Sequence, residues 1–192
     1  MSKFYYPIEI VEMREQGLAS PVSASFGRVR NNNTRNHQGW DLYAPVGTPC
    51  YAIAAGVVEW IKSTGSYGQQ LGIRFFKDGS AETSAVMSRP TYLAFYAHLQ
   101  TGSITVREAE AVLAGQRTAK TGTTGNASPN TPHLHYEIRT RLDKRIGVGL
   151  QGRADPGESL GYERYACRQI PIGTNHTGLQ SLPRRGKATP LR

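Results

Sequence analysis

Cysteine is scarce in this chain of 192 residues, which contains two. Cys50 and Cys167 lie far apart and form no C-x-x-C pair, so thiolate zinc fingers and dithiol redox motifs are excluded. Cys50 falls in a strand-like run, where we expect a small buried hydrophobe, and a Cys50–Cys167 disulfide stays open. The chemistry of the protein must therefore depend on other side chains.

Long apolar runs are also missing. No stretch approaches the length of about 20 residues that spans a bilayer, so we expect no transmembrane segment. Residues 1–10 show no charged region followed by an apolar core, so we expect no Sec signal peptide and synthesis in the cytoplasm.

Acidic residues are outnumbered by basic ones, and the formal net charge is +9. Such a surface favours polyanionic partners, which include nucleic acid, anionic lipid and anionic cell-wall polymer. The sequence has no helix-turn-helix pattern, no aromatic platform and no zinc-finger spacing, so we expect no nucleic-acid partner.

Glycine and proline, in contrast, are frequent, with 21 and 11 residues. Apolar and alternating runs, separated by turn-rich segments, predict strands at residues 50–61, 70–76, 92–99 and 132–139. This succession predicts an all-β fold of mainly antiparallel sheets, with minor short helices near residues 10–16 and 107–112.

The same pass along the chain predicts three parts. Residues 1–25 form an N-terminal arm, residues 26–140 a compact domain, and residues 141–192 a C-terminal extension that ends in a flexible basic tail.

Histidine occurs only five times, yet four of the five lie in three short clusters. The clusters are His37-x-x-x-Asp41, Tyr96-Ala97-His98-Leu99 and His133-Leu134-His135. Imidazole is the commonest protein ligand for zinc and a carboxylate completes many catalytic sites, so the clustering predicts a metal site. The fifth histidine, His176, lies in the tail, where we expect a solvated side chain.

The spacing within the clusters supports a shared site. His133 and His135 are two residues apart in a predicted strand and therefore point to the same face. His37 and Asp41 are four apart, and Gly39 with the nearby proline opposes a helix, so an extended segment would again give one shared face. Two segments thus each offer a pair of ligands on one side.

The clusters belong to a longer series of motifs over residues 26–139. The motifs are Phe26–Gly27, His37–Leu42, Ala44–Pro49, Ala55–Val58, Tyr67–Gly68, Tyr96–Leu99, Gly122-x-x-Gly125 and Pro132–Arg139. In this order and combination the chain resembles the LytM/lysostaphin family of zinc endopeptidases that cut peptidoglycan. The resemblance implies a LytM-like zinc peptidase domain over residues 26–140.

The resemblance also implies a role for each clustered residue. His37, Asp41 and His135 would hold Zn²⁺, and His98 and His133 would lie beside it as catalytic groups. Three protein ligands leave zinc an open position for water, whose pKa the metal lowers. We expect His133 to act as the base and His98 to hydrogen-bond the water or the oxyanion.

The chain departs from the family pattern in two places. Some members place a tyrosine shortly before the first zinc histidine, but this chain has none between Tyr6 and His37. Candidates to replace it are Arg28, Arg30 and Arg35. The polar loop at residues 77–90 is longer than usual and is expected to wall one side of the groove.

The expected function is hydrolysis of peptide cross-links in bacterial peptidoglycan, with the peptide stems as partner. We favour the direct D-Ala–diaminopimelate cross-link, because no appended Gram-positive wall-binding domain is evident. The alternatives are a glycyl-glycine endopeptidase, a zinc hydrolase of non-wall peptides, and a non-enzymatic peptidoglycan-binding or amidase-activating module. Degenerate relatives of the last kind lack zinc ligands, which this chain retains.

A wall hydrolase without a leader needs another route to the wall. One hypothesis is a secreted antibacterial effector, delivered by type VI secretion or by phage-type release. It would act in the periplasm or cell wall of a target cell, and its partners would include a cognate immunity protein or the secretion machinery.

Overall fold

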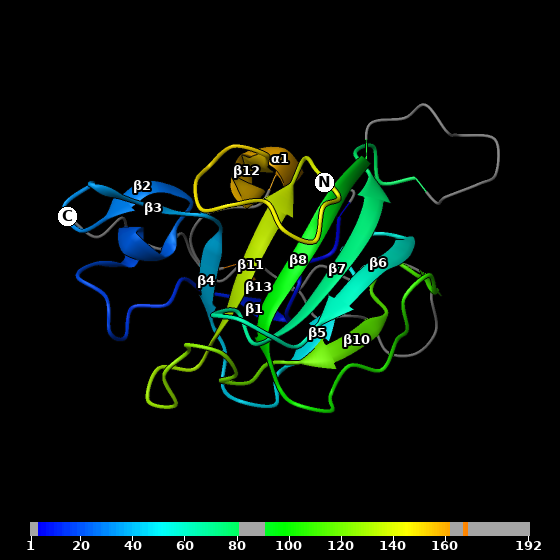
Figure 1. Ribbon diagram of the computed structural model, residues 1–192, viewed down its shortest axis with the longest axis horizontal. Helices are drawn as coiled ribbons and strands as arrows, with labels where there is room; N and C mark the ends of the chain where they lie inside the picture. Colours follow the sequence, from blue (N-terminus) through cyan, green and yellow to red (C-terminus); the bar gives the residue numbers. More distant parts are fainter. Residues whose placement is uncertain (1–3, 81–90, 162–166, 169–192) are drawn as a thin grey trace.

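The structure is a computed structural model that describes residues 4–80, 91–161 and 167–168 (Figure 1). Almost all regular structure in these residues is strand. The helices among them are the 3₁₀ helix η1 (Pro21–Ala24) and the short helix α1 (Pro156–Leu160). The predicted all-β class with mainly antiparallel sheets and minor short helices is confirmed.

A seven-stranded antiparallel sheet forms the centre of the molecule. Its path runs β12-β11-β8-β7-β6-β9, and β4 pairs with β11 beside β12. The strands are β4 (Trp40–Tyr43), β6 (Gly56–Lys62), β7 (Gln69–Phe76), β8 (Thr91–Leu99), β9 (Ala111–Val112), β11 (His133–Arg139) and β12 (Arg153–Ala154).

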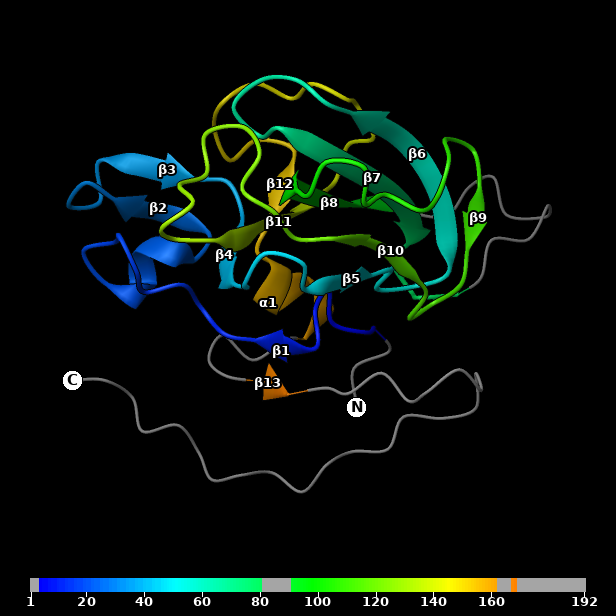
Figure 2. The same cartoon turned by 90° about the horizontal axis from the view of Figure 1, so that it is seen from below.

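Three two-stranded antiparallel ribbons surround this sheet. They are β1 (Ile10–Val11) with β13 (Cys167–Arg168), β2 (Gly27–Arg30) with β3 (Arg35–His37), and β5 (Pro49–Tyr51) with β10 (Arg117–Lys120). The β2–β3 hairpin lies at one end of the molecule, beyond β4, in both Figure 1 and Figure 2.

Strand β11 is buried on both faces, and alternation gives the two faces different chemistry. Leu134, Tyr136 and Ile138 point into the main apolar core, where they join side chains such as Trp40. The residues between them are polar and also buried; they are His133, His135, Glu137 and Arg139. One face of this strand therefore supports the fold and the other presents functional groups.

Both ends of the described chain contribute to the main core. Phe4, Ile8 and Val11 from the N-terminal segment and Leu160 from α1 are buried in it. Figure 2 shows β1 and α1 together on the same side of the sheet. The predicted division into three parts stays a prediction, but residues from all three share one core.

The helix predicted near residues 10–16 is wrong. Ile10–Val11 is a strand, and the next residues run along β4: Tyr43 N donates to Glu12 O at 2.8 Å, and Arg14 N donates to Asp41 O at 2.9 Å. A single short helix is marginal in water, whereas these hydrogen bonds satisfy the backbone at a sheet edge.

The helical turn predicted near residues 107–112 is also wrong, because this segment pairs with β6. Val58 N donates to Glu110 O, and β9 pairs with the start of β6. The predicted strand at residues 50–61 is divided into β5 and β6 by a bend at residues 52–55.

Cys50 is buried, as expected; its thiol is free, and burial raises the pKa of that thiol. The side chain of Cys167, most of the predicted loop at 77–90, and the tail with His176 lie outside the described residues. Within the described residues, neither helix is long and apolar enough to cross a membrane.

Candidate metal centre

The register of the sheet places His135 at the middle of the candidate site. Its Cα is opposite Asp41 on β4 and opposite Ala97 on β8. Residues opposite each other in an antiparallel pair share a face, so the Asp41 carboxylate and the His135 imidazole project to the same side. The site is therefore built on the central strands rather than on loops.

Three donor atoms converge at this point. His37 Nε2 lies 3.1 Å from Asp41 Oδ1, His135 Nδ1 lies 2.8 Å from the same oxygen, and the two ring nitrogens are 3.2 Å apart. These residues form a buried group whose ligand atoms could hold a metal ion. Tetrahedral zinc with bonds of about 2.0–2.1 Å would require donor separations of about 3.3 Å, close to those seen.

In His37 and in His135, the ring nitrogen that points away from the other donors already has a hydrogen-bond partner. His37 Nδ1 lies 2.8 Å from Ser25 O, and His135 Nε2 lies 3.0 Å from Glu137 Oε1. Both acceptors require an N–H there, so the inward nitrogens present lone pairs. Two lone pairs and a carboxylate oxygen so close together repel one another unless a cation or a proton lies between them. The donor set therefore fits a metal ion.

The second oxygen of Asp41 is held by two arginines. Arg14 Nη2 donates to Oδ2 at 2.9 Å and Arg30 Nη2 donates to it at 2.5 Å. Burial pushes the pKa of Asp41 upward, but the electrostatic interactions with His37 and His135 outweigh this effect. The pKa lies well below its usual range, and the group stays a carboxylate with one oxygen directed at the imidazoles.

The Glu137 carboxylate accepts hydrogen bonds from four side chains, which together form a second network. Its Oε1 accepts from His135 Nε2 and from Tyr67 Oη, each at 3.0 Å. Its Oε2 accepts from Arg139 Nε at 2.7 Å and from Arg153 Nε at 2.8 Å. Although burial alone would raise the pKa of Glu137, the His135 hydrogen bond and the arginine charges lower it. A carboxylate of this kind fixes the orientation and tautomer of a ligand histidine.

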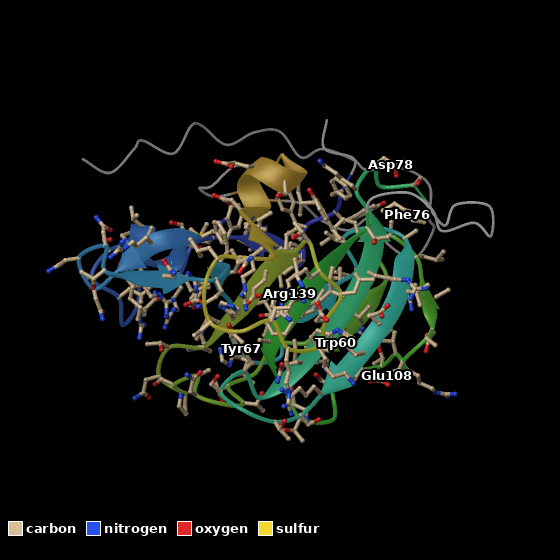
Figure 3. All side chains as sticks on the ribbon, turned by 45° about the horizontal axis from the view of Figure 1, so that its top comes forward. Trp60, Tyr67, Phe76, Asp78, Glu108 and Arg139 are labelled. Carbon is tan, nitrogen blue, oxygen red and sulfur yellow. The ribbon has the colours of Figure 1, made fainter. Side chains whose placement is uncertain are left out.

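Aromatic side chains enclose this network. The ring of Tyr67 stacks on His135 with centroids 5.0 Å apart, and the Arg139 guanidinium lies 3.8 Å from the ring centre of Phe95. Figure 3 shows Tyr67, Trp60 and Arg139 over the middle of the sheet. The packing restricts movement of the His135 ring.

His98 and His133 lie beside the three donors, with their rings 4.9 Å apart. His98 Nδ1 lies 2.8 Å from Thr124 O, and His133 Nδ1 lies 2.9 Å from Thr131 O. A carbonyl can only accept, so both rings carry the proton on Nδ1 and a lone pair on Nε2. His133 Nε2 is 3.8 Å from Asp41 Oδ1 and therefore faces the centre.

Both of these histidines are neutral near pH 7. Burial lowers the pKa of His98 to about 4, and it also lowers the pKa of His133. A neutral imidazole with a free Nε2 can accept a proton from a nearby water or substrate.

His98 reaches the site through a β-bulge. Between β7 and β8 the register moves from Leu71↔Tyr96 to Gln69↔Leu99, so β8 has one extra residue there. His98 has a φ of 58°, in the left-handed region that non-glycine residues rarely adopt. Strict alternation would place His98 and Ala97 on different faces of the sheet. The bulge instead directs the His98 ring toward His133.

The structure brings together all five residues predicted for the site: His37, Asp41, His98, His133 and His135. The single extended segment predicted for His37 and Asp41 is wrong, because they lie on different strands, β3 and β4, with a bend at Gly39 between them. Of the three arginines predicted to replace a tyrosine, Arg30 reaches Asp41.

Sequence analysis missed several groups that support the donors. Glu137 could have been found, since it follows His133 and His135 at the same even spacing on one strand. Arg14 and Arg153 carry no such signal, because they reach the site from segments far away in the sequence.

The donor set is that of a metal-binding centre built on an antiparallel sheet. Residues 35–147 match the family model described as Peptidase family M23. The chain belongs to this family.

Similar proteins agree with this assignment. The chain is 36% identical over 145 residues to peptidoglycan DD-endopeptidase ShyC of Vibrio cholerae, covering 70% of this chain and 29% of that protein. It is 37% identical over 122 residues to DD-carboxypeptidase/endopeptidase Mpg of Neisseria meningitidis, covering 62% of this chain and 24% of that protein. The chain thus spans less than a third of the length of these curated relatives.

A solved structure of LytU has a similar fold. It superposes with a TM-score of 0.52 at 26% sequence identity, covering 80% of this chain and 85% of that one.

Proposed function

We propose that this protein is a zinc endopeptidase that hydrolyses peptide cross-links of peptidoglycan. His37, Asp41 and His135 would hold the zinc, and His98 and His133 would handle protons. The observation that carries the proposal is the convergence of three lone-pair donors, 2.8–3.2 Å apart, beside two neutral histidines with free Nε2 atoms.

Zinc supplies Lewis-acid polarisation of the scissile carbonyl and acidifies water when it is bound. His133 accepts the proton from the attacking water at Nε2, which faces the donors. His98, whose Nδ1–H is held by Thr124 O, has a lone pair on Nε2 and accepts a hydrogen bond from the attacking water. The leaving amine then takes a proton back from His133.

The proposed substrate is the direct D-Ala–diaminopimelate cross-link. The relative ShyC is named a peptidoglycan DD-endopeptidase and Mpg a DD-carboxypeptidase/endopeptidase, which supports this bond over a glycine bridge. A glycyl-glycine endopeptidase is the second enzymatic candidate. A non-enzymatic wall-binding or amidase-activating module is disfavoured, because such modules lack the ligands that this site retains.

Digestion of purified sacculi, followed by mass analysis of the released muropeptides, tests the function. Zinc-loaded protein should reduce cross-linked dimers and generate free amines, and His133→Ala and metal-stripped protein should do neither. Intact sacculi with zinc-loaded protein would refute the proposed substrate.

Action in the wall or periplasm of a target cell is a separate proposal, with an immunity protein or secretion machinery as partners. Fractionation of producer and target cells tests it. Protein found only in the cytoplasm of the producer would rule it out.

A further inference from the structure

The buried surroundings of the proposed metal position contain more cations than anions. Among the described residues, two carboxylates form ion pairs with four guanidinium groups. The groups are Asp41 and Glu137, with Arg14, Arg30, Arg139 and Arg153. A divalent metal ion increases this positive surplus. An anionic group on the substrate would offset it, so the charge of the site favours a substrate with a carboxylate near the scissile bond.

Arg30 is the arginine of this set that solvent can reach. Its side chain is 19% exposed, whereas that of Arg14 is 9% exposed and those of Arg139 and Arg153 are nearly buried. Arg30 Nε donates to Ser23 O at 3.0 Å and Nη2 donates to Asp41 Oδ2. Within the described residues, Nη1 of Arg30 contacts no protein acceptor. The guanidinium therefore has a free donor edge beside a proposed ligand.

The position of Arg30 is fixed from both ends. Its backbone belongs to the β2–β3 hairpin, where it pairs with Arg35, and its carbonyl accepts from Thr34 N at 3.1 Å. Its guanidinium is held by Ser23 O and by Asp41. A donor that is already oriented loses little conformational entropy when a ligand binds.

The chemistry of a direct cross-link supplies a matching anion. The scissile nitrogen belongs to the D-centre of diaminopimelate, and that carbon also carries a free carboxylate. By ordinary bond lengths this carboxylate lies within about 4 Å of the scissile carbonyl carbon. Arg30 Nη2 donates to Oδ2 of Asp41, the carboxylate whose Oδ1 faces the imidazoles of His37 and His135, so the guanidinium lies next to a proposed metal ligand. A glycine bridge has no carboxylate at this place.

We propose that Arg30 binds the free carboxylate next to the scissile bond and thereby selects direct cross-links whose diaminopimelate is not amidated. This inference rests on the proposed function and names the feature of the substrate that the site selects. Arg30 is a specificity-determining residue in this role, in addition to its contact with Asp41.

The experiment compares two purified cross-linked dimers that differ only in whether this carboxylate is free or amidated. The zinc-loaded protein should show kcat/KM at least about tenfold higher for the free acid, as expected for one charge-assisted hydrogen bond. Arg30→Gln should bring the ratio of the two kcat/KM values close to one. The ratio is the readout, because disturbance of Asp41 lowers both rates together and leaves it unchanged.

Matched variants isolate the effect. Arg28→Gln makes the same charge change at an exposed position of the same strand and should keep the wild-type ratio. Arg30→Lys should retain part of the preference. Calorimetric titration of each dimer into zinc-loaded His133→Ala, with and without Arg30→Gln, should show the same loss of preference in Kd.

The outcomes separate the two proposals. If the wild type cuts both dimers at equal rates, or if Arg30→Gln keeps the wild-type ratio, the role of Arg30 is refuted and the endopeptidase function stands. If zinc-loaded wild type cuts neither dimer, the proposed function fails, and this inference fails with it.

Discussion

At the scale of single residues, each imidazole of the site has one nitrogen committed to a fixed acceptor. His37, His98 and His133 each use Nδ1 toward a backbone carbonyl, whereas His135 uses Nε2 toward Glu137. The committed nitrogen determines the tautomer, and the tautomer determines which nitrogen presents a lone pair to the centre. The histidines proposed as ligands and those proposed as proton carriers are thus chemically similar and differ in their distance from Asp41.

Substitution of the two kinds of residue should separate zinc binding from catalysis. Asp41→Asn keeps the shape of the side chain but removes its charge, and it should lose zinc. His98→Ala and His133→Ala should keep zinc and lose about 10²–10⁴-fold in kcat, the usual contribution of general acid–base groups. Metal analysis after dialysis against a zinc buffer, combined with muropeptide kinetics, measures both effects.

Asp143→Asn is the control for this comparison, because it makes the same change at a carboxylate that is 49% exposed. It should leave zinc content and rate unchanged. Absence of zinc from the His98→Ala protein would contradict the division of roles.

Residue types, spacing and the family resemblance were enough to select five side chains that the structure brings together, whereas their roles stay a prediction. His133 and His135 share a face because alternation is local to one strand. Arg14 could not be predicted, because its contact with Asp41 depends on where the N-terminal segment packs against β4. Spacing describes one strand at a time, whereas ion pairs between distant segments depend on the tertiary fold.

At the scale of elements, two irregularities position the site. The bulge in β8 directs His98 toward His133, and the bend at Gly39 allows His37 and Asp41 to approach from separate strands. The sequence predicted a strand at residues 92–99, which β8 confirms, but it did not predict the bulge. A bulge depends on how the neighbouring strand is paired, so periodicity within β8 does not reveal it.

Gly39→Ala tests the bend. A Cβ at this position would lie 2.1 Å from Tyr136 O and 2.9 Å from Glu137 Cγ, so the backbone of β11 or of the bend must move. We expect a loss of about 3 kcal/mol, at the upper end for overpacking. In a protein of this size that corresponds to a fall in Tm of about 6–12 °C. Zinc affinity should fall as well, because the bend joins the two proposed ligands His37 and Asp41.

Gly47→Ala provides the comparison for thermal unfolding. An added Cβ there meets nothing within 4 Å, although the φ of 90° imposes strain of about 1–2 kcal/mol. This variant should lose less stability and keep its zinc. Equal zinc affinity in Gly39→Ala and wild type would show that the bend does not position the ligands.

At the scale of the whole molecule, the site depends on segments on both sides of the family match at residues 35–147. Arg14 precedes it and holds Asp41; Arg153 follows it and holds Glu137. Arg153 is itself oriented by three backbone carbonyls, those of Ile146, Gly147 and Gly149. The proposed metal centre and the fold therefore depend on the same buried ion pairs.

This coupling predicts that acid destabilises the metal-free protein. The pKa values of Asp41 and Glu137 are lowered in the folded state, whereas unfolded Asp and Glu titrate near about 3.9 and 4.3. The unfolded chain then binds more protons as the pH falls, so the stability that these carboxylates contribute is present above about pH 4.3 and is lost below it.

Thermal unfolding in the presence of a chelator should give a Tm that falls steeply between about pH 4.5 and 3. Glu137→Gln should start from a lower Tm but show a shallower fall, and Glu15→Gln, at an exposed position, should keep the wild-type slope. Parallel slopes for wild type and Glu137→Gln would show that the buried Glu137 network does not govern acid stability.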